Sequence, residues 1–165
     1  MKKISSILFL TVLLFSSLIF SPQVEASSVN QLVPTAPIDS EEYVPYGAKP
    51  PGSSASTHNI SISRYNYQVA RVGAQVYTDK FINGKTRMSI YVNNWKVLDD
   101  LGGSNNEMTI VLNNSSHKTI ASYTVTIKNG SASAHFVGLN ASTKYYITFV
   151  VPTNGNKYSF NGYIN

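Results

Sequence analysis

The feature that most constrains this fold is the alternation of apolar and polar residues in short segments from His58 onward. In "TRMSIYV" (residues 86–92), Met88, Ile90 and Val92 share one face. The same pattern recurs in "EMTIVL", "SYTVTI", "SASAHF", "KYYITFVV" and "KYSFNGYI". Side chains of a β-strand alternate between two faces, so each segment predicts a strand with one buried face. Asn-Gly pairs between the segments favour the positive φ angles that tight hairpins require.

These six segments and a long segment that precedes them make seven predicted strands. No segment has a helical period, so the sequence predicts an all-β fold over residues 58–165. The arrangement expected is an antiparallel sandwich of two sheets, with a closed barrel as the alternative. The first strand, within residues 59–81, is long and expected to break near Ala70 to Gly73. The chain has no cysteine. Its core therefore has to stabilise the domain without disulfides.

The N-terminal residues 1–26 have the pattern of a secretory signal peptide. Lys2 and Lys3 precede an apolar run over residues 7–20, and small residues near Ala26 suit a cleavage point. The run is short for a membrane span, although an uncleaved anchor is the alternative. No second apolar span follows. We therefore expect a secreted, extracellular product without stable membrane insertion after signal cleavage.

Residues 27–57 are rich in Pro and Ser and are expected to be a disordered linker. They contain five of the seven prolines and few apolar residues. Such a segment buries too little surface to offset its ordering entropy. The composition of the whole chain, rich in Asn, Ser, Tyr, Lys and Ile, resembles that of secreted proteins from low-GC Gram-positive bacteria.

The charge of the chain favours an anionic partner. The formal net charge is +5 at pH 7, and Asp39, Glu41 and Glu42 lie in the linker. The segment after the linker is therefore more basic than the whole. Wall polymers, acidic polysaccharide and phospholipid head groups are the partners this predicts, although solubility alone explains the same charge. Export and the lack of an arginine cluster argue against nucleic acid.

The segment "GLNASTKYYITF" (residues 138–149) resembles the corner between two strands in fibronectin type III and related immunoglobulin-like modules. In that family a leucine ends one strand, a turn with a threonine follows, and a tyrosine opens the next strand. Leu139, Thr143 and Tyr145 match these places. The resemblance implies a seven-stranded immunoglobulin-like sandwich in which Tyr145 is buried. A tyrosine folded back where the chain crosses between sheets can satisfy one unpaired backbone carbonyl with its hydroxyl.

The position of Trp95 is open on the sequence alone. The family places a buried tryptophan in this strand, but Trp95 is out of phase with Met88, Ile90 and Val92. A bulge at Asn93 and Asn94 would turn the indole inward. Without that bulge, Trp95 would lie on the outer surface.

The residues that carry catalysis are scarce, and we expect no enzyme activity. The three histidines are scattered, and no nucleophile elbow, zinc helix or phosphate loop occurs. Asp99, Asp100, Asn105 and Glu107 could supply calcium ligands, but their spacing fits no calcium loop that we can name, and a polar hairpin with glycines for the turn explains the same residues. We therefore expect no metal and no cofactor.

The parity of the strands predicts a surface of aromatic and basic side chains. Tyr77, Tyr91, Tyr146 and Tyr163 should face away from the core. Exposed rings can stack on sugars or anchor a protein interface, although tyrosine is also an ordinary strand residue. The predicted binding residues are Tyr77, Tyr91, Trp95, Tyr146, Arg71 and Lys80, with the three tyrosines forming one flat platform.

Together these features predict a secreted bacterial binding module without catalytic activity. Its partner would be a cell-wall polymer, a polysaccharide or another anionic polymer of the cell envelope or extracellular space. The alternative is an exported effector, such as an enzyme inhibitor or bacteriocin-like factor, that acts on an extracellular protein.

Overall fold

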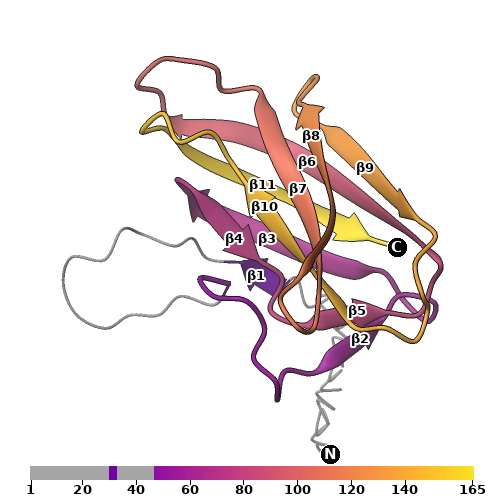
Figure 1. Cartoon of the computed structure of the whole chain (residues 1–165). Helices are drawn as coiled ribbons and strands as arrows, with labels where there is room; N and C mark the ends of the chain where they lie inside the picture. Colours follow the sequence, from indigo (N-terminus) through magenta and orange to yellow (C-terminus); the bar gives the residue numbers. More distant parts are fainter. Residues whose placement is uncertain (1–29, 33–46) are drawn as a thin grey trace, which may run out of the picture.

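The computed structural model describes residues 30–32 and 47–165 (Figure 1). The expected signal peptide, residues 1–26, lies outside the described residues, as does most of the expected linker. Within the described part, no helix has the length and apolar character that crossing a bilayer requires.

The described residues form an all-β structure. The strands are β1 (Asn30–Leu32), β2 (Thr57–Asn59), β3 (Tyr65–Val72), β4 (Gln75–Tyr77), β5 (Phe81–Asn83), β6 (Arg87–Asp99), β7 (Glu107–Asn114), β8 (Thr119–Thr126), β9 (Ala132–Val137), β10 (Tyr145–Val150) and β11 (Lys157–Ile164). The expected count of seven is wrong, because the stretch expected as one broken strand corresponds to four strands, β2 to β5, and β1 is a further strand. The other six expected strands are β6 to β11.

Two sheets pack face to face as a sandwich (Figure 1). The first sheet has the order β1-β3-β11-β6-β9, and the second has the order β2-β5-β10-β7-β8, with β4 pairing with β10. All described pairs are antiparallel except β1–β3 and β2–β5. Two separate sheets fit the predicted sandwich and not the alternative closed barrel.

The chain passes from the first sheet to the second just after β3. β3 ends at Val72 in the first sheet, and β4 begins at Gln75 in the second. Before this crossing, Val69 and Val72 pair with Phe160 and Tyr158, so β3 has one residue more than β11 over this stretch. The break expected near Ala70 to Gly73 therefore combines a β-bulge with a change of sheet.

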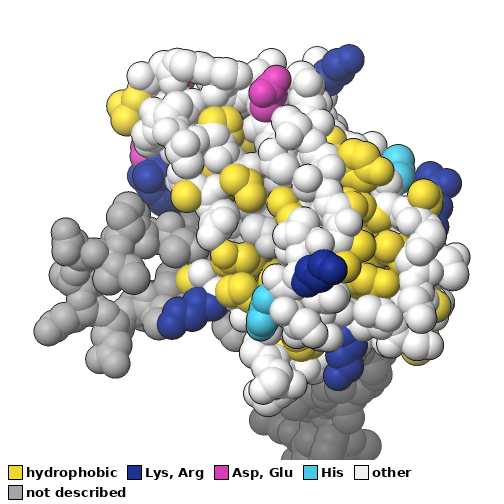
Figure 2. Space-filling view, in the orientation of Figure 1, with side chains coloured by type: hydrophobic (Ala, Val, Ile, Leu, Met, Phe, Trp, Pro, Cys, Tyr) yellow, Lys and Arg dark blue, Asp and Glu magenta, His cyan; other side chains and the backbone are white. Residues whose placement is uncertain are grey.

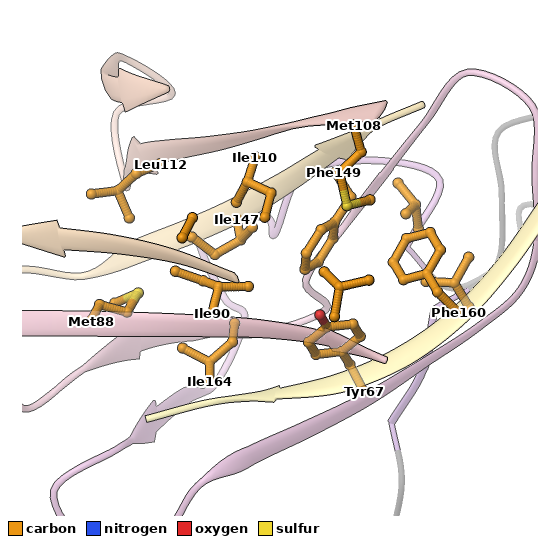
Figure 3. Packing of buried hydrophobic residues seen from close by; sticks show 14 of the residues in the cluster. Tyr67, Met88, Ile90, Met108, Ile110, Leu112, Ile147, Phe149, Phe160 and Ile164 are labelled. Atoms are coloured by element: carbon orange, nitrogen blue, oxygen red, sulfur yellow. The ribbon is translucent and has the colours of Figure 1, made fainter. Parts of the chain in front are cut away.

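The inner faces of the two sheets form one apolar core (Figure 3). Side chains from β7 and β10 meet those from β3, β6 and β11 in the space between the sheets. The residues labelled there are buried: Tyr67, Met88, Ile90, Met108, Ile110, Leu112, Ile147, Phe149, Phe160 and Ile164. On β6 and β7 these positions follow the alternation of the sequence, because successive side chains of a strand point to opposite faces. On β10 both faces are covered, and Tyr145 to Phe149 are all buried.

The corner before β10 has a buried tyrosine, as expected. Tyr145 is buried, and its hydroxyl oxygen accepts a hydrogen bond from the Asn140 N–H at 3.1 Å. We expected a carbonyl as its partner on physical grounds, so the group that Tyr145 satisfies is a donor instead. The hydroxyl still binds a backbone group of the turn that leads into its strand.

Ordered structure begins before His58. The Tyr77 N–H donates to the Gly47 carbonyl at 2.9 Å, and the Phe81 N–H donates to the Ser56 carbonyl at 3.0 Å. Pro51 is buried, and β2 starts at Thr57. The last part of the expected disordered linker therefore packs on the second sheet, where its carbonyls pair backbone donors of β4 and β5.

Candidate functional site

The outer face of the first sheet carries two stacked tyrosines. Tyr91 of β6 and Tyr163 of β11 are direct neighbours across the antiparallel pair. Their ring centroids are 4.6 Å apart and the ring planes differ by 23°. Both residues are half-buried, whereas their strand neighbours Ile90 and Ile164 are fully buried in the core. The alternation of the strands therefore places both rings on the outer surface.

Arg64 and His135 extend this pair into a row across the sheet. The Arg64 Cζ atom lies 4.6 Å from the centroid of the Tyr163 ring. On the other side, the His135 ring is 6.1 Å from Tyr91 in an edge-to-face arrangement. The His135 Nδ1 atom lies 3.0 Å from the Ser89 Oγ atom. We call these four residues the Tyr91 row: Arg64, Tyr163, Tyr91 and His135.

The rings of the Tyr91 row stand on edge. β11 lies between β3 and β6, so Tyr163 has Arg64, which immediately precedes β3, on one side and Tyr91 on the other. Stacking at these distances occupies both faces of the Tyr163 ring. Ring edges, hydroxyls and the guanidinium therefore remain as the groups that a ligand can reach.

A shallow groove lies beside the Tyr91 row on the same face. Its volume is about 540 Å³, and it is open to solvent. Its outward-facing lining residues are Gln68, Ala70, Asn94, Lys96, Ser159 and Asn161. Asn161 is two residues from Tyr163 on β11, so the groove continues the row along the strand. The lining is rich in amide and hydroxyl groups, which can donate to and accept from a polar ligand.

A bulge in β6 shapes this groove and decides the position of Trp95. Asn161 pairs with Asn93, but Ser159 pairs with Lys96, so β6 has one residue more than β11 between these pairs. Asn94 has a φ of 54°, and its side-chain amide donates to the Asn161 Oδ1 atom at 3.3 Å. An extra residue reverses the faces of those that follow it. Lys96 consequently points outward and Trp95 inward.

Trp95 is thus part of the packing and not of the surface site we predicted. Its ring lies 4.7 Å from the Tyr158 ring and 5.5 Å from the Phe160 ring. Its Nε1–H donates to the Asn105 carbonyl at 3.0 Å. The indole is partly buried against the core and fixes the loop that follows β6.

Tyr77 and Tyr146 lie on the opposite side of the molecule from Tyr91. They belong to β4 and β10 of the second sheet, so the three tyrosines do not form the single platform we predicted. The platform fails because alternation fixes only whether a residue faces in or out. It does not fix the sheet to which a strand belongs.

Tyr146 is in addition buried, with 3% of its surface exposed. Its ring packs against Tyr77 and Phe81, and its hydroxyl lies 3.2 Å from the His117 Nδ1 atom. Burial, and then the proximity of Tyr77, raises the pKa of Tyr146. Figure 2 shows the side of β7 and β8, where hydrophobic patches reach the surface and Lys and Arg lie mostly towards the margins.

The two predicted basic residues are also separated. Arg71 forms a salt bridge with Asp99 at one end of the first sheet. Lys80 lies in the turn between β4 and β5 of the second sheet, where its carbonyl accepts from the Thr78 hydroxyl at 3.1 Å. Neither the tyrosines nor the cations of the predicted set therefore gather at one place, and Tyr91 alone lies in the Tyr91 row.

The acidic residues near the β6–β7 loop have other partners. Asp99 binds Arg71, and the Asp100 Oδ1 atom accepts from the Gly102 N–H at 3.0 Å. Within the described ranges, no three His, Cys, Asp or Glu residues gather as metal ligands would. The geometry of this loop is that of a polar turn.

Several residues of the outer face were absent from the predicted site: Arg64, Lys96, Asn161 and Tyr163. The outward direction of Tyr163 followed from parity, but its stacking on Tyr91 depends on the pairing of β6 with β11. Arg64 precedes Tyr65 and Tyr67, and the same parity could have placed it outward. Lys96 could not be placed without the bulge.

Comparison with known proteins adds no family. No protein-family model matches the chain, and no curated protein matches it in sequence.

Proposed function

We propose that this protein is a secreted, non-catalytic binding module for an anionic polymer of the cell envelope or extracellular space. Its binding surface is the outer face of the first sheet, formed by the Tyr91 row and the adjoining groove. The sandwich is of the immunoglobulin-like type, which the buried corner Tyr145 and the two-sheet architecture support.

The observation that carries this proposal is the charge of the outer face. Arg87, Lys96 and Lys157 lie on it by the parity of their strands, and Arg64 lies on it over the Tyr163 ring. The strands of the first sheet contain one acidic residue, Asp99, and Arg71 already pairs with it. A face with several cations and a neutralised carboxylate attracts polyanions.

The rigidity of the face supports binding without a large entropic cost. The groups of the Tyr91 row come from neighbouring strands of one sheet, and each ring is held by its neighbour. Side chains already fixed before binding lose little freedom on binding. The free energy of binding is therefore not offset by a large entropic cost of ordering these side chains.

The one histidine-serine pair on this face does not favour catalysis. Ser89 and His135 are within hydrogen-bonding distance, which is a first requirement for an activated serine. Stabilising an acyl-transfer intermediate also needs donors for the developing oxyanion. The Ser89 N–H already donates to the Asn165 carbonyl at 2.8 Å. The serine itself is buried, which restricts the access of a substrate to its hydroxyl.

The test compares two variants that lose the same charge. In the first, Arg64, Lys96 and Lys157 are replaced by Gln; in the control, Lys118, Lys128 and Lys144 are replaced by Gln. Retention on isolated cell walls is measured at low and high salt. We expect the first variant to lose retention, the control to keep it, and high salt to weaken the wild-type protein, because salt screens exposed charges. Equal retention of both variants would contradict the proposal.

The alternative, an exported effector with a protein target, is supported by strand β8. β8 is the edge of the second sheet and contains no charged residue. Ile120 and Tyr123 on this strand are 46% and 47% exposed. Edge strands usually carry charges that prevent pairing with other chains, and an edge without them can accept an added strand. A Ser122→Lys variant that abolishes envelope retention, together with retention that survives high salt, would favour this alternative.

A further inference from the structure

We infer that the bound polymer is an extended polyanion that lies along β6 and β11, parallel to the strands. The inference rests on the proposed function and specifies how the outer face uses its charges. It predicts recognition through the spacing of anionic groups and not through stacking of sugar rings.

The cations lie in sequence along the strand direction. On β6, Arg87 is four residues from Tyr91, whose row contains Arg64. Lys96 lies beyond the bulge and pairs with Ser159, which is four residues from Tyr163 on β11. Lys157 is two residues further along β11.

These positions translate into approximate separations. With a rise of about 3.3 Å per residue, Arg87 and Lys96 each lie about 13 Å from the Tyr91 row, and Lys157 lies about 7 Å beyond Lys96. The four cations therefore extend over about 33 Å along the strands. Across the strands, the lysines and arginines of the row are confined to Arg64. A polyanion that followed the strands would meet all four cations, whereas one that crossed them would meet one or two.

The groove and the rings agree with this direction. Lys96, Asn94, Asn161 and Ser159 line the groove between the Tyr91 row and Lys157, so a chain that follows β11 passes through it. The faces of the Tyr163 ring are occupied by Arg64 and Tyr91. The ring therefore offers a sugar no free face to stack on, and its contribution is to hold the Arg64 guanidinium in place.

The test uses linear polyphosphate of two lengths, one shorter than about 13 Å and one longer than about 33 Å, the two separations set by the strand rise. Polygalacturonate of matching length distinguishes carboxylate from phosphate, and dextran is the neutral control. Dissociation constants are measured for the wild-type protein, for the end variants Arg87→Gln and Lys157→Gln, for Arg64→Gln in the middle of the face, and for Lys118→Gln and Lys128→Gln as matched controls.

We expect the long polyanion to bind more tightly per charge than the short one, and dextran not to bind. Arg87→Gln and Lys157→Gln, at the two ends of the face, should each lower the affinity for the long polyanion about fivefold. Each should also reduce the slope of log affinity against log salt by about one, while the control variants change neither the affinity nor the slope. If the end variants bind the long polyanion like the wild type while Arg64→Gln weakens it, the ligand crosses the strands and this inference is wrong, although the proposed function stands. If no polyanion binds at either length, the proposed function itself fails. Tight binding of dextran would show that charge spacing is not what the face recognises.

Discussion

Tyr67 and Tyr91 connect the core of the sandwich to its outer face. Tyr67 is fully buried on β3, and its hydroxyl donates to the Tyr91 carbonyl oxygen at 2.7 Å. The Tyr91 side chain points the other way and stacks on Tyr163. The backbone that holds the Tyr91 row is thus fixed from inside the molecule, by a group that no ligand reaches.

Replacing Tyr67 by Phe should lower the free energy of unfolding by about 1–2 kcal/mol, since the hydroxyl loses its bond and the carbonyl loses a donor. Tyr163→Phe, on the half-exposed surface, is the control and should change it by less than about 0.5 kcal/mol. Urea unfolding of the two variants measures the difference. A neutral Tyr67→Phe would mean that the hydrogen bond contributes nothing to the fold.

The same residue predicts a loss of stability at alkaline pH. Burial raises the pKa of Tyr67 well above its ordinary value. The contribution is fully present below about pH 10, where the unfolded chain keeps its proton, and it is lost as the pH rises toward the folded-state pKa. The decline should approach about 1.4 kcal/mol per pH unit for this group. Urea unfolding at several alkaline pH values measures it, and Tyr67→Phe should fall less steeply than the wild-type protein.

Gly162 is required by the close packing of Tyr67 and Tyr91. A Cβ atom at this position would lie 1.8 Å from the Tyr91 carbonyl oxygen and 2.6 Å from the Tyr67 hydroxyl oxygen. Because one of these atoms is backbone, Gly162→Ala should force a shift of the strand and cost about 1–3 kcal/mol. Gly52→Ala is the matched control, since nothing lies within 4 Å of its added methyl group. Thermal unfolding of the two variants should separate them, and equal midpoints would contradict this packing.

Trp95 should contribute to stability and not to binding. Trp95→Ala removes its contacts with Tyr158 and Phe160 and should cost about 3 kcal/mol, the low end for buried aromatics because the indole is partly exposed. Trp95→Phe keeps a ring and should cost less. Polymer binding per folded molecule should be unchanged in both. Loss of binding in a variant that remains folded would show that Trp95 takes part in binding, as the sequence predicted.

The corner Tyr145 gives a further test of the fold. In Tyr145→Phe the Asn140 N–H loses its acceptor, and we expect a cost of about 1–2 kcal/mol. Tyr123→Phe, on a half-exposed side chain, should be close to neutral. Equal effects of the two substitutions on chemical unfolding would show that the corner hydroxyl has no structural role.

The sequence alone determined the strands β6 to β11 and the direction of most of their side chains. Met88, Ile90 and Val92 are buried as predicted, and so are Ile147 and Phe149. These assignments succeed because alternation is local: the pleat of a strand places neighbours on opposite faces whatever the strand pairs with. The turns were predictable for the same reason, since Asn-Gly pairs favour their conformation without help from distant residues.

The tertiary structure alone decided which outward residues share a face. The alternation of apolar residues predicts that Tyr91 and Tyr146 both face away from the core. Tyr91 stacks on Tyr163 on the first sheet, whereas Tyr146 is buried on the second sheet. Sheet membership depends on pairing between strands far apart in the chain, and no local period records it. The bulge at Asn94 acts in the same way: one extra residue, visible only against β11, exchanges the places of Trp95 and Lys96 and so shapes the proposed binding face.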